Sequence, residues 1–247
     1  MRVTGTGAWF SAACVALAAV LVGFGVAGCG YGNNNNASGV GCGLANDVPQ
    51  GPPLNPNVVN EFLFVPNALC APGVANDVMS VLVFDPATVT FNNGPIPVVE
   101  TGNEPVWATV DPTNSFVYVT NFADNTVSAF TLDTTTGAIG LVNGSPFPAG
   151  VGPAAAAVDP TGTFLYVANQ GGVVDNVVFP GSISGYKITP VTGVLTPVGA
   201  PFTTATPLSP QQGIAVTAGF VYVSDVTTGD VSAFSFNDSG TLTQLAT

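Results

Sequence analysis

The sequence predicts an all-β protein built from repeated sheets of four antiparallel strands, the blades of a β-propeller. Three observations predict this class. A segment recurs at a period of about 40–50 residues, which is typical of propeller blades or arrays. Short apolar runs alternate with clusters of Gly, Pro, Asn, Asp and Thr, and no helical periodicity lasts longer than a turn. We expect about four blades, arranged as an open arc.

The repeat is clearest over residues 106–147, VWATVDPTNSFVYVTNFADNTVSAFTLDTTTGAIGLVNGSPF. A second copy ends at Phe202, and a third begins at Gly213 and runs to the C-terminus. A weaker, earlier copy comprises residues 62–67 and 78–86. We therefore expect the propeller to occupy residues 57–247, with blades at about 57–104, 105–152, 153–209 and 210–247.

Each full repeat is expected to form four strands. In the clearest copy we predict strands at Val106–Val110, Phe116–Thr120, Thr126–Leu132 and Ala138–Val142. The second strand is FVYV, FLYV and FVYV in the three copies, apolar without a break. Such a run is typical of a strand covered on both faces, as the middle strands of a blade are between two neighbours.

Turn residues occupy equivalent places in the copies. Asp111-Pro112 and Asp159-Pro160 separate the first and second strands, where an Asx-turn and the fixed φ of proline suit a reversal, and Thr217 takes the place of the aspartate in the last copy. A polar residue also ends each second strand, and we expect its side chain to bond its own backbone rather than a ligand: Asn121, Asn169 and Asp225.

The N-terminus has the features of an export signal. Arg2 precedes an apolar stretch from Ala8 to Val22, and the small residues Val26-Ala27-Gly28 lead into Cys29. This sequence resembles the lipobox of bacterial lipoproteins, which implies cleavage of residues 1–28 and a lipid on Cys29.

Two alternatives to the lipoprotein stay open at the N-terminus. One is an ordinary secretory signal, and the other is an uncleaved anchor over Ala8–Val26, which is just long enough to span a bilayer. Residues 29–56, with four consecutive asparagines and a Gly-Pro-Pro, are expected to be a flexible spacer. We expect the protein to be extracytoplasmic, in the bacterial cell envelope or secreted, and to touch the membrane only through its lipidated N-terminus.

Four cysteines are present, of which Cys14 lies in the predicted signal and Cys29 is assigned to lipid. Cys42 and Cys70 remain as a candidate disulfide in an oxidising compartment, with two free thiols as the alternative. A bridge closing this loop of about 27 residues would stabilise the fold by about 3–4 kcal/mol. We predict no metal site, since no zinc-binding spacing is present and the sequence contains no histidine.

The charge balance excludes several partners. Two basic residues, Arg2 and Lys187, stand against 14 acids, and removal of residues 1–28 leaves a net charge of −13. Such a surface cannot neutralise phosphates, so we expect no nucleic-acid partner. Anionic lipid headgroups would repel it as well.

The segment Tyr118-Val119-Thr120-Asn121 and its two relatives in the later copies resemble the YVTN family of β-propeller repeats. The wider frame, A-V-D-P-T-G-x-F-L-Y-V-A-N followed by I-S-x-Y and T-G-x-L-T-P-V, is similar to the β-propeller lactonase family that contains 6-phosphogluconolactonase-like proteins. The resemblance covers about residues 57–247. It implies a seven-bladed ring, of which these blades would be an incomplete part, and hydrolysis of a sugar lactone by basic and histidine side chains in the central channel.

The sequence departs from that implied chemistry. Histidine is absent, and Lys187 falls in or just after a third strand, toward the rim. The only carboxylates outside the repeating turn positions are Glu61, Glu100, Glu104, Asp175 and Asp230. No spacing among them indicates a general acid–base pair, and neither Asp124-Asn125 nor Asp175-Asn176 lies in a calcium-loop pattern.

We therefore expect a binding or scaffold module that uses no cofactor and whose ligand is an unidentified protein or carbohydrate. The alternative is a lactonase acting on a sugar or sugar-phosphate lactone, with unknown catalytic residues. Four blades in an open arc would leave an apolar face uncovered at each end. Three alternatives follow: the chain is a fragment of a longer protein, it self-associates through those faces, or the four blades close into a tight ring. We expect an open arc, from a truncated or incomplete reading frame.

Overall fold

The computed structural model describes residues 14–21, 24–31, 61–67, 77–85, 90–92, 99–203, 211–225 and 229–245. Every helix or strand assigned among them is a β-strand, which confirms the all-β class. Over this part of the chain, no helix has the length and apolarity needed to cross a membrane.

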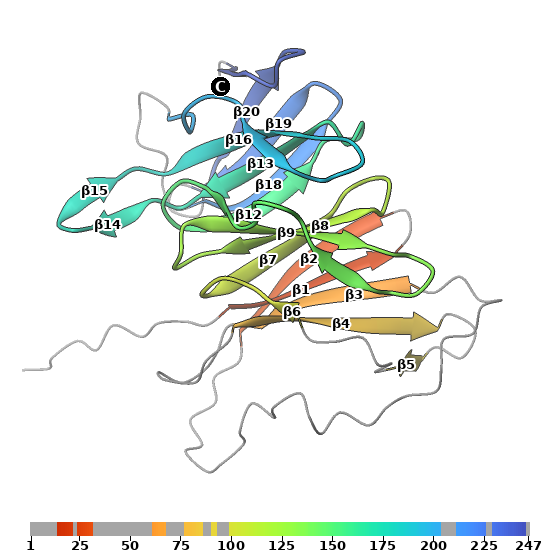
Figure 1. Cartoon of the computed structure of the whole chain (residues 1–247). Helices are drawn as coiled ribbons and strands as arrows, with labels where there is room; N and C mark the ends of the chain where they lie inside the picture. Colours follow the sequence, from red (N-terminus) through yellow and green to blue (C-terminus); the bar gives the residue numbers. More distant parts are fainter. Residues whose placement is uncertain are drawn as a thin grey trace, which may run out of the picture.

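Four antiparallel sheets are stacked on one another in chain order, as Figure 1 shows, and we call them blades 1 to 4. Blade 1 has the strand order β2-β1-β3-β4-β5, with β6 also paired to β4. Its strands are β1 (Cys14–Leu21), β2 (Phe24–Tyr31), β3 (Glu61–Asn67), β4 (Val78–Asp85), β5 (Thr90–Asn92) and β6 (Val99–Glu100).

Blades 2 to 4 each consist of four strands paired in sequence order, and blade 2 adds a short fifth. Blade 2 contains β7 (Pro105–Val110), β8 (Phe116–Asn121), β9 (Thr126–Leu132), β10 (Ile139–Leu141) and the short β11 (Phe147–Pro148). Blade 3 contains β12 (Pro153–Val158), β13 (Phe164–Asn169), β16 (Ser182–Ile188) and β17 (Leu195–Pro197). Blade 4 contains β18 (Gln211–Thr217), β19 (Phe220–Asp225), β20 (Val231–Phe236) and β21 (Leu242–Gln244). The four strands predicted for the clearest repeat are therefore confirmed.

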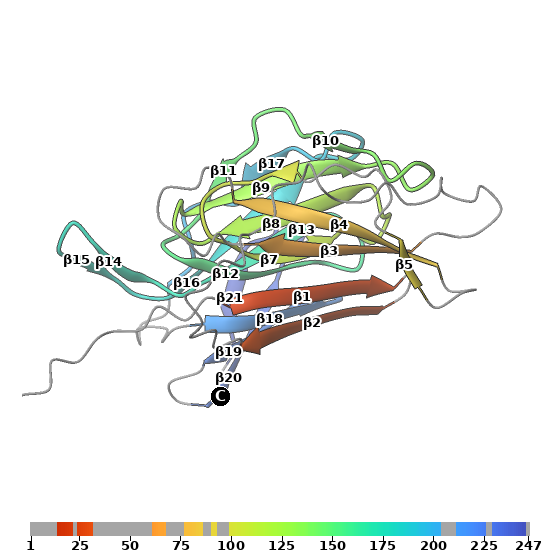
Figure 2. The same cartoon turned by 90° about the horizontal axis from the view of Figure 1, so that it is seen from below.

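The first strands of successive blades lie side by side and form the inner edge of the stack. β7 contacts β12, and β12 contacts β18; Figure 2 shows them on the opposite side of the sheets from the outer strands β10 and β17. In blade 1, β1 takes the corresponding place, since it pairs with β3 and contacts β7. β1 and most of β2 belong to the residues predicted to be an export signal, so the predicted cleavage would remove the inner strand of blade 1. The signal itself stays a prediction.

The second strands of blades 2 and 3 are buried along their whole length, as their unbroken apolar sequences predicted. Every residue of β8 and β13 is buried. The cause is the stacking, because each of these strands has another blade on either face. Apolar side chains from two adjacent blades form each layer of the core.

The aspartates between first and second strands are Asx-turn residues, as predicted. Asp159 is buried, and its Oδ2 accepts hydrogen bonds from the Thr161 backbone N–H (3.0 Å) and hydroxyl (2.5 Å). Its Oδ1 accepts from the backbone N–H groups of Thr163 (2.7 Å) and Phe164 (2.6 Å). Asp111 makes the equivalent contacts in blade 2. One carboxylate thus satisfies the donors of a whole turn.

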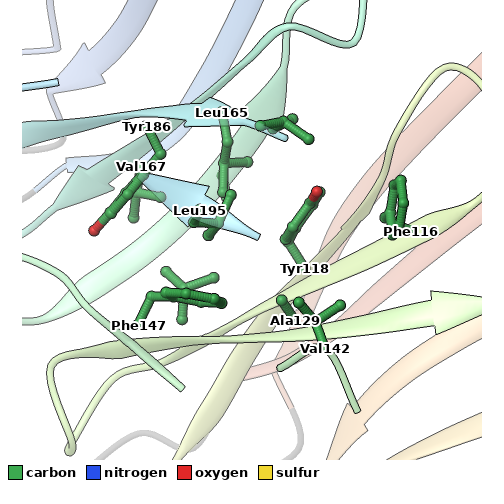
Figure 3. Close-up of a cluster of buried hydrophobic side chains, with 12 residues drawn as sticks. Phe116, Tyr118, Ala129, Val142, Phe147, Leu165, Val167, Tyr186 and Leu195 are labelled. Atoms are coloured by element: carbon green, nitrogen blue, oxygen red, sulfur yellow. The ribbon is translucent and has the colours of Figure 1, made fainter. Parts of the chain in front are cut away.

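One contact recurs between blades and fixes their stacking. In blade 2, Phe116 and Tyr118 point toward blade 3 (Figure 3), and the Tyr118 hydroxyl donates a hydrogen bond to the backbone carbonyl of Gly193 (3.3 Å). Gly193 lies in the turn between β16 and β17 with φ of 70°, and a Cβ there would lie 2.3 Å from Cδ1 of Phe116. Only glycine lets this turn approach the ring so closely.

The same contact joins blade 3 to blade 4. The Tyr166 hydroxyl donates to the carbonyl of Gly240 (2.9 Å), and a Cβ on Gly240 would lie 2.5 Å from Cε1 of Phe164. Burial raises the pKa of the Tyr118 and Tyr166 hydroxyls, and the nearby carboxylates of Asp111 and Asp159 raise it further. Both hydroxyls therefore stay protonated at neutral pH and donate to the glycine carbonyls. We call this arrangement the Phe-x-Tyr/glycine contact.

Candidate functional site

The end of the stack at which first strands begin and second strands finish is the best candidate for a functional surface, and we call it the loop end. Register shifts occur there in three blades, between Pro105 and Trp107, Pro153 and Ala155, and Gln211 and Gly213. Such β-bulges are over-represented beside binding and catalytic sites, because they re-aim side chains. The loop end therefore combines bulges with the connections between blades.

The buried asparagines that end the second strands are structural. Asn121 accepts a hydrogen bond from the Gly102 N–H (3.1 Å) and donates to the hydroxyls of Thr126 and Ser128 (both 2.9 Å). Asn169 similarly donates to the hydroxyls of Ser182 (3.1 Å) and Ser184 (3.0 Å). The structural role predicted for Asn121 and Asn169 is confirmed, but the predicted partner was wrong. Both side chains bind the adjacent third strand rather than their own backbone, and Asn121 also binds the incoming connection.

Two carboxylates at the loop end are engaged with the connection that leads into blade 2. Asp124 accepts hydrogen bonds from the backbone N–H (2.8 Å) and the side-chain amide (2.7 Å) of Asn103. Asp77 accepts from the backbone N–H of Glu104, a residue with positive φ of 54°. These acids hold a strained connection in place.

The carboxylates singled out in the sequence are spread over different blades. Glu100 lies in β6 and Glu104 precedes β7, whereas Asp175 lies in the connection between β13 and β16, and Asp230 precedes β20. Glu61 is the first residue of β3. Within the described ranges, no group of three or more His, Cys, Asp or Glu residues is placed to hold a metal ion.

The inner strands of blades 2 to 4 carry no ionisable residue. Their sequences are PVWATV in β7, PAAAAV in β12 and QQGIAVT in β18. The polar group of the largest of these side chains, the Trp107 indole N–H, donates to the backbone carbonyl of Ala156 in the next blade (2.8 Å). Lys187 lies on the third strand of blade 3 and is exposed, away from the inner edge. The inner strands of blades 2 to 4 thus supply uncharged side chains alone.

Sequence reasoning missed a β-hairpin that projects from the loop end of blade 3 (Figure 1). Its strands are β14 (Gly172–Val174) and β15 (Val177–Phe179). Asp175 and Asn176 form its two-residue turn, both with positive φ, as in a type I′ turn. The sequence feature that indicates this hairpin is a two-residue turn sequence between two apolar runs, Val-Val-Asp-Asn-Val-Val.

The hairpin exposes apolar side chains on both of its faces. Five large ones are between 38% and 76% exposed: Val173, Val174, Val177, Val178 and Phe179. Asp175 at its tip is also exposed. Among the residues that the structure describes, no other connection between a second and a third strand contains strands of its own. The hairpin is therefore a distinctive surface of blade 3.

The cysteines assigned from the sequence are only partly covered by the structure. Cys29 lies in β2, where its Cα is paired with that of Ala16. Cys42 and Cys70 lie outside the described residues, so their predicted disulfide stays a prediction.

Comparison with known proteins identifies relatives of this arrangement. The family model described as lactonase, 7-bladed beta-propeller, matches residues 66–247. No curated protein matches the sequence.

Three solved structures illustrate the structural likeness. A candidate 6-phosphogluconolactonase from Bacteroides uniformis is similar with a TM-score of 0.57 and 18% identity, over 74% of this chain and 50% of that protein. A protein of unknown function from Desulfotomaculum acetoxidans is similar with a TM-score of 0.56 and 23% identity, over 75% of this chain and 51% of that protein. A candidate 6-phosphogluconolactonase from Bacteroides fragilis is similar with a TM-score of 0.56 and 17% identity, over 74% of this chain and 50% of that protein. The chain thus spans about half the length of these proteins, and at such identities the likeness shows the fold alone.

Proposed function

The chain belongs to the lactonase family of seven-bladed β-propellers, and from this membership and the geometry above we propose that it acts as a binding or scaffold module without lactone hydrolysis. The proposal includes export and tethering through a lipid on Cys29. Mass spectrometry of the protein from a membrane fraction tests the tether: an N-terminal, lipid-modified Cys29 supports it, and an intact residue 1 contradicts it.

The observation that carries the binding role is the β14–β15 hairpin. Five large apolar side chains on one small, projecting element form a surface that soluble proteins rarely leave exposed without a use. Its strands also have unpaired edges, which can pair with an added strand. Both features suit a protein partner.

The hydrogen bonds of the carboxylates argue against catalysis. Asp77, Asp111, Asp124 and Asp159 accept hydrogen bonds from backbone N–H groups of turns and connections. A general acid–base pair needs carboxyl groups that face a substrate together and have separated pKa values. The inner strands of blades 2 to 4 supply no ionisable partner either.

The charge restricts the ligand. Outside residues 1–28 the sequence has one basic residue, Lys187, against 14 acids. A phosphorylated or otherwise anionic ligand would meet repulsion and no clamp of arginine or lysine. We therefore propose an uncharged or cationic binding surface on the partner.

Lactone hydrolysis is the second candidate function, and family membership favours it. The names of the Bacteroides relatives point to a sugar-phosphate lactone for those proteins. Because this chain spans about half of their length, residues outside the four blades would have to complete such a site.

A hydrolysis assay separates the two functions. We expect the purified chain to leave the rate of δ-gluconolactone opening, followed by acid release in weak buffer, at the rate of buffer alone. The variants Glu104→Gln and Asp175→Asn should give the same rate. Turnover above buffer would contradict the proposal, and its loss in either variant would locate the acid responsible.

A further inference from the structure

The loop end of blades 2 to 4 is acidic, whereas the basic residue lies at the opposite end. Carboxylates at the loop end precede a first or third strand, end a second strand or lie in the hairpin: Glu104, Asp124, Asp175, Asp225 and Asp230. Lys187, the one Lys or Arg within the described ranges, is opposite Phe164 at the start of β13 and so lies at the other end. The field at the loop end therefore attracts cations.

The β14–β15 hairpin rises from this acidic end, and its base is bonded to the connection that comes from blade 2. The backbone N–H of Gly171 donates to the carbonyl of Val151 (2.8 Å). The next residue, Gly152, donates its N–H to the side chain of Asn125 (2.8 Å), and Asn125 follows the exposed Asp124. These two hydrogen bonds place the hairpin beside an exposed carboxylate of the neighbouring blade.

Both faces of the hairpin are apolar, and one charge stands at its tip. Residues directly opposite each other in two paired strands share a face. Val173 and Val178 therefore occupy one face, and Val174 and Val177 occupy the other. Asp175 lies in the turn that joins them and is exposed. A ligand that covers the valines thus meets a carboxylate at the end of the hairpin.

A basic, partly apolar protein segment fits this surface better than a lipid or a second copy of the chain. A lipid surface that took up the valines would also have to take up the Asp175 carboxylate, which costs free energy. A second copy presents the same acidic loop end, and the juxtaposed like charges would repel. A lysine or arginine instead packs its methylene stem on apolar side chains while its charged head reaches a carboxylate.

The strand edges of the hairpin indicate the conformation of such a segment. Among the described residues, β14 and β15 are paired only with each other. Each strand therefore has an edge at which an extended segment can add as a further strand, held by main-chain hydrogen bonds. Side chains of an added strand alternate between its two faces, so apolar and basic residues at alternate positions can serve both requirements.

We propose that the β14–β15 hairpin binds an extended segment of a partner protein in which apolar residues alternate with lysine or arginine. The inference rests on the proposed binding function and specifies the chemistry of its partner. The apolar side chains of the segment cover the exposed valines, and its basic groups face Asp175 and the acids of the neighbouring blades.

Three blocked hexapeptides test the proposal by calorimetric titration of the full chain in about 20 mM NaCl. Their sequences are (Lys-Val)3, (Lys-Ser)3 and (Glu-Val)3. We expect (Lys-Val)3 to bind saturably at concentrations up to about 1 mM. The peptide (Lys-Ser)3 should bind about tenfold more weakly because it lacks the apolar side chains, and (Glu-Val)3 should not bind. Raising NaCl to about 300 mM should weaken the binding of (Lys-Val)3 about threefold or more.

The matched control is a loop exchange that keeps the net charge. Residues 170–181 are replaced by Phe-Ala-Asp-Asn, the sequence of residues 122–125, which make the equivalent connection in blade 2. Both segments contain one aspartate, so that general attraction of cations to an acidic protein stays the same. The affinity for (Lys-Val)3 should fall to that for (Lys-Ser)3, since the apolar hairpin is gone.

Point variants give the same test in chains that retain the hairpin. Val178→Thr should weaken the binding of (Lys-Val)3 about threefold, whereas Leu141→Thr, at a similarly exposed position of the outer strand β10, should leave it unchanged. Asp175→Asn should weaken binding by about two- to fivefold. Asp133→Asn makes the same change of charge at the opposite end of the stack and should have no effect.

The outcomes separate this inference from the proposed function. Equal affinity for (Lys-Val)3 and (Glu-Val)3, lost on loop exchange, would refute the basic partner and leave the hairpin as the binding surface. Absence of binding by all three peptides would refute the extended segment. Undiminished binding of (Lys-Val)3 after loop exchange, or equal effects of each variant and its control, would refute the hairpin itself as a binding surface, and with it the observation that carries the proposed function.

Discussion

Replacing Gly193 with alanine will lower the free energy of unfolding by about 3 kcal/mol, because two penalties add. The residue has φ of 70°, a conformation that costs an L-residue about 1–2 kcal/mol. The new Cβ would also lie 2.3 Å from Cδ1 of Phe116, so that the ring or the turn must shift. Urea titration followed by tryptophan fluorescence in a Trp9→Phe background measures the loss, since Trp107 lies at the contact between blades 2 and 3.

Gly219→Ala is the matched control for the Gly193 variant. Gly219 has φ of 86°, and nothing lies within 4 Å of a Cβ added there. Its loss should be the conformational penalty alone, about 1 kcal/mol. A loss as large as that of Gly193→Ala would contradict the close packing against Phe116. In a double variant with Phe116→Val, the two losses should be less than additive, because the clash disappears.

Replacing Asp159 with alanine will cost about 3 kcal/mol, since the change leaves the buried N–H of Phe164 and two partly buried backbone donors of the turn without an acceptor. The carboxylate is 2% exposed and accepts four hydrogen bonds, three of them from backbone N–H groups. The first and second strands of blade 3 are joined by this turn, so the loss should appear in global unfolding by urea, monitored by circular dichroism.

Asp133→Ala is the control for the turn carboxylate. Asp133 also accepts hydrogen bonds from two backbone N–H groups, those of Thr135 and Thr136, but it is exposed. Water can replace the carboxylate there, so we expect a change within about 0.5 kcal/mol. Equal losses for Asp133→Ala and Asp159→Ala would show that burial of the turn is not what makes Asp159 important.

The strands and turns were predictable because their causes are local. The FVYV runs indicated strands covered on both faces, and Asp111-Pro112 and Asp159-Pro160 indicated Asx-turns. The pairing of β1 with β3 was not predictable, because the apolar segment containing β1 has the composition of an export signal and nothing in it specifies a register with Leu63 and Phe64.

The contact between blades was beyond sequence reasoning for a different reason. Tyr118 and Gly193 are 75 residues apart, and the glycines of the T-G-x-L turns read locally as ordinary turn residues. Only the stacking shows that Gly193 and Gly240 also contact the aromatic pair of the preceding blade. The β14–β15 hairpin was not predictable because its strands are only three residues long and interrupt the four-strand pattern of the repeat.

The stacking itself is tested most directly by the reactivity of individual tyrosines in the folded chain. If each blade covers the Phe-x-Tyr pair of the one before it, tetranitromethane will nitrate Tyr222 while Tyr118 and Tyr166 stay unmodified until urea unfolds the protein. Nitration of Tyr118 or Tyr166 in the native chain as fast as that of Tyr222 would contradict the stacked blades.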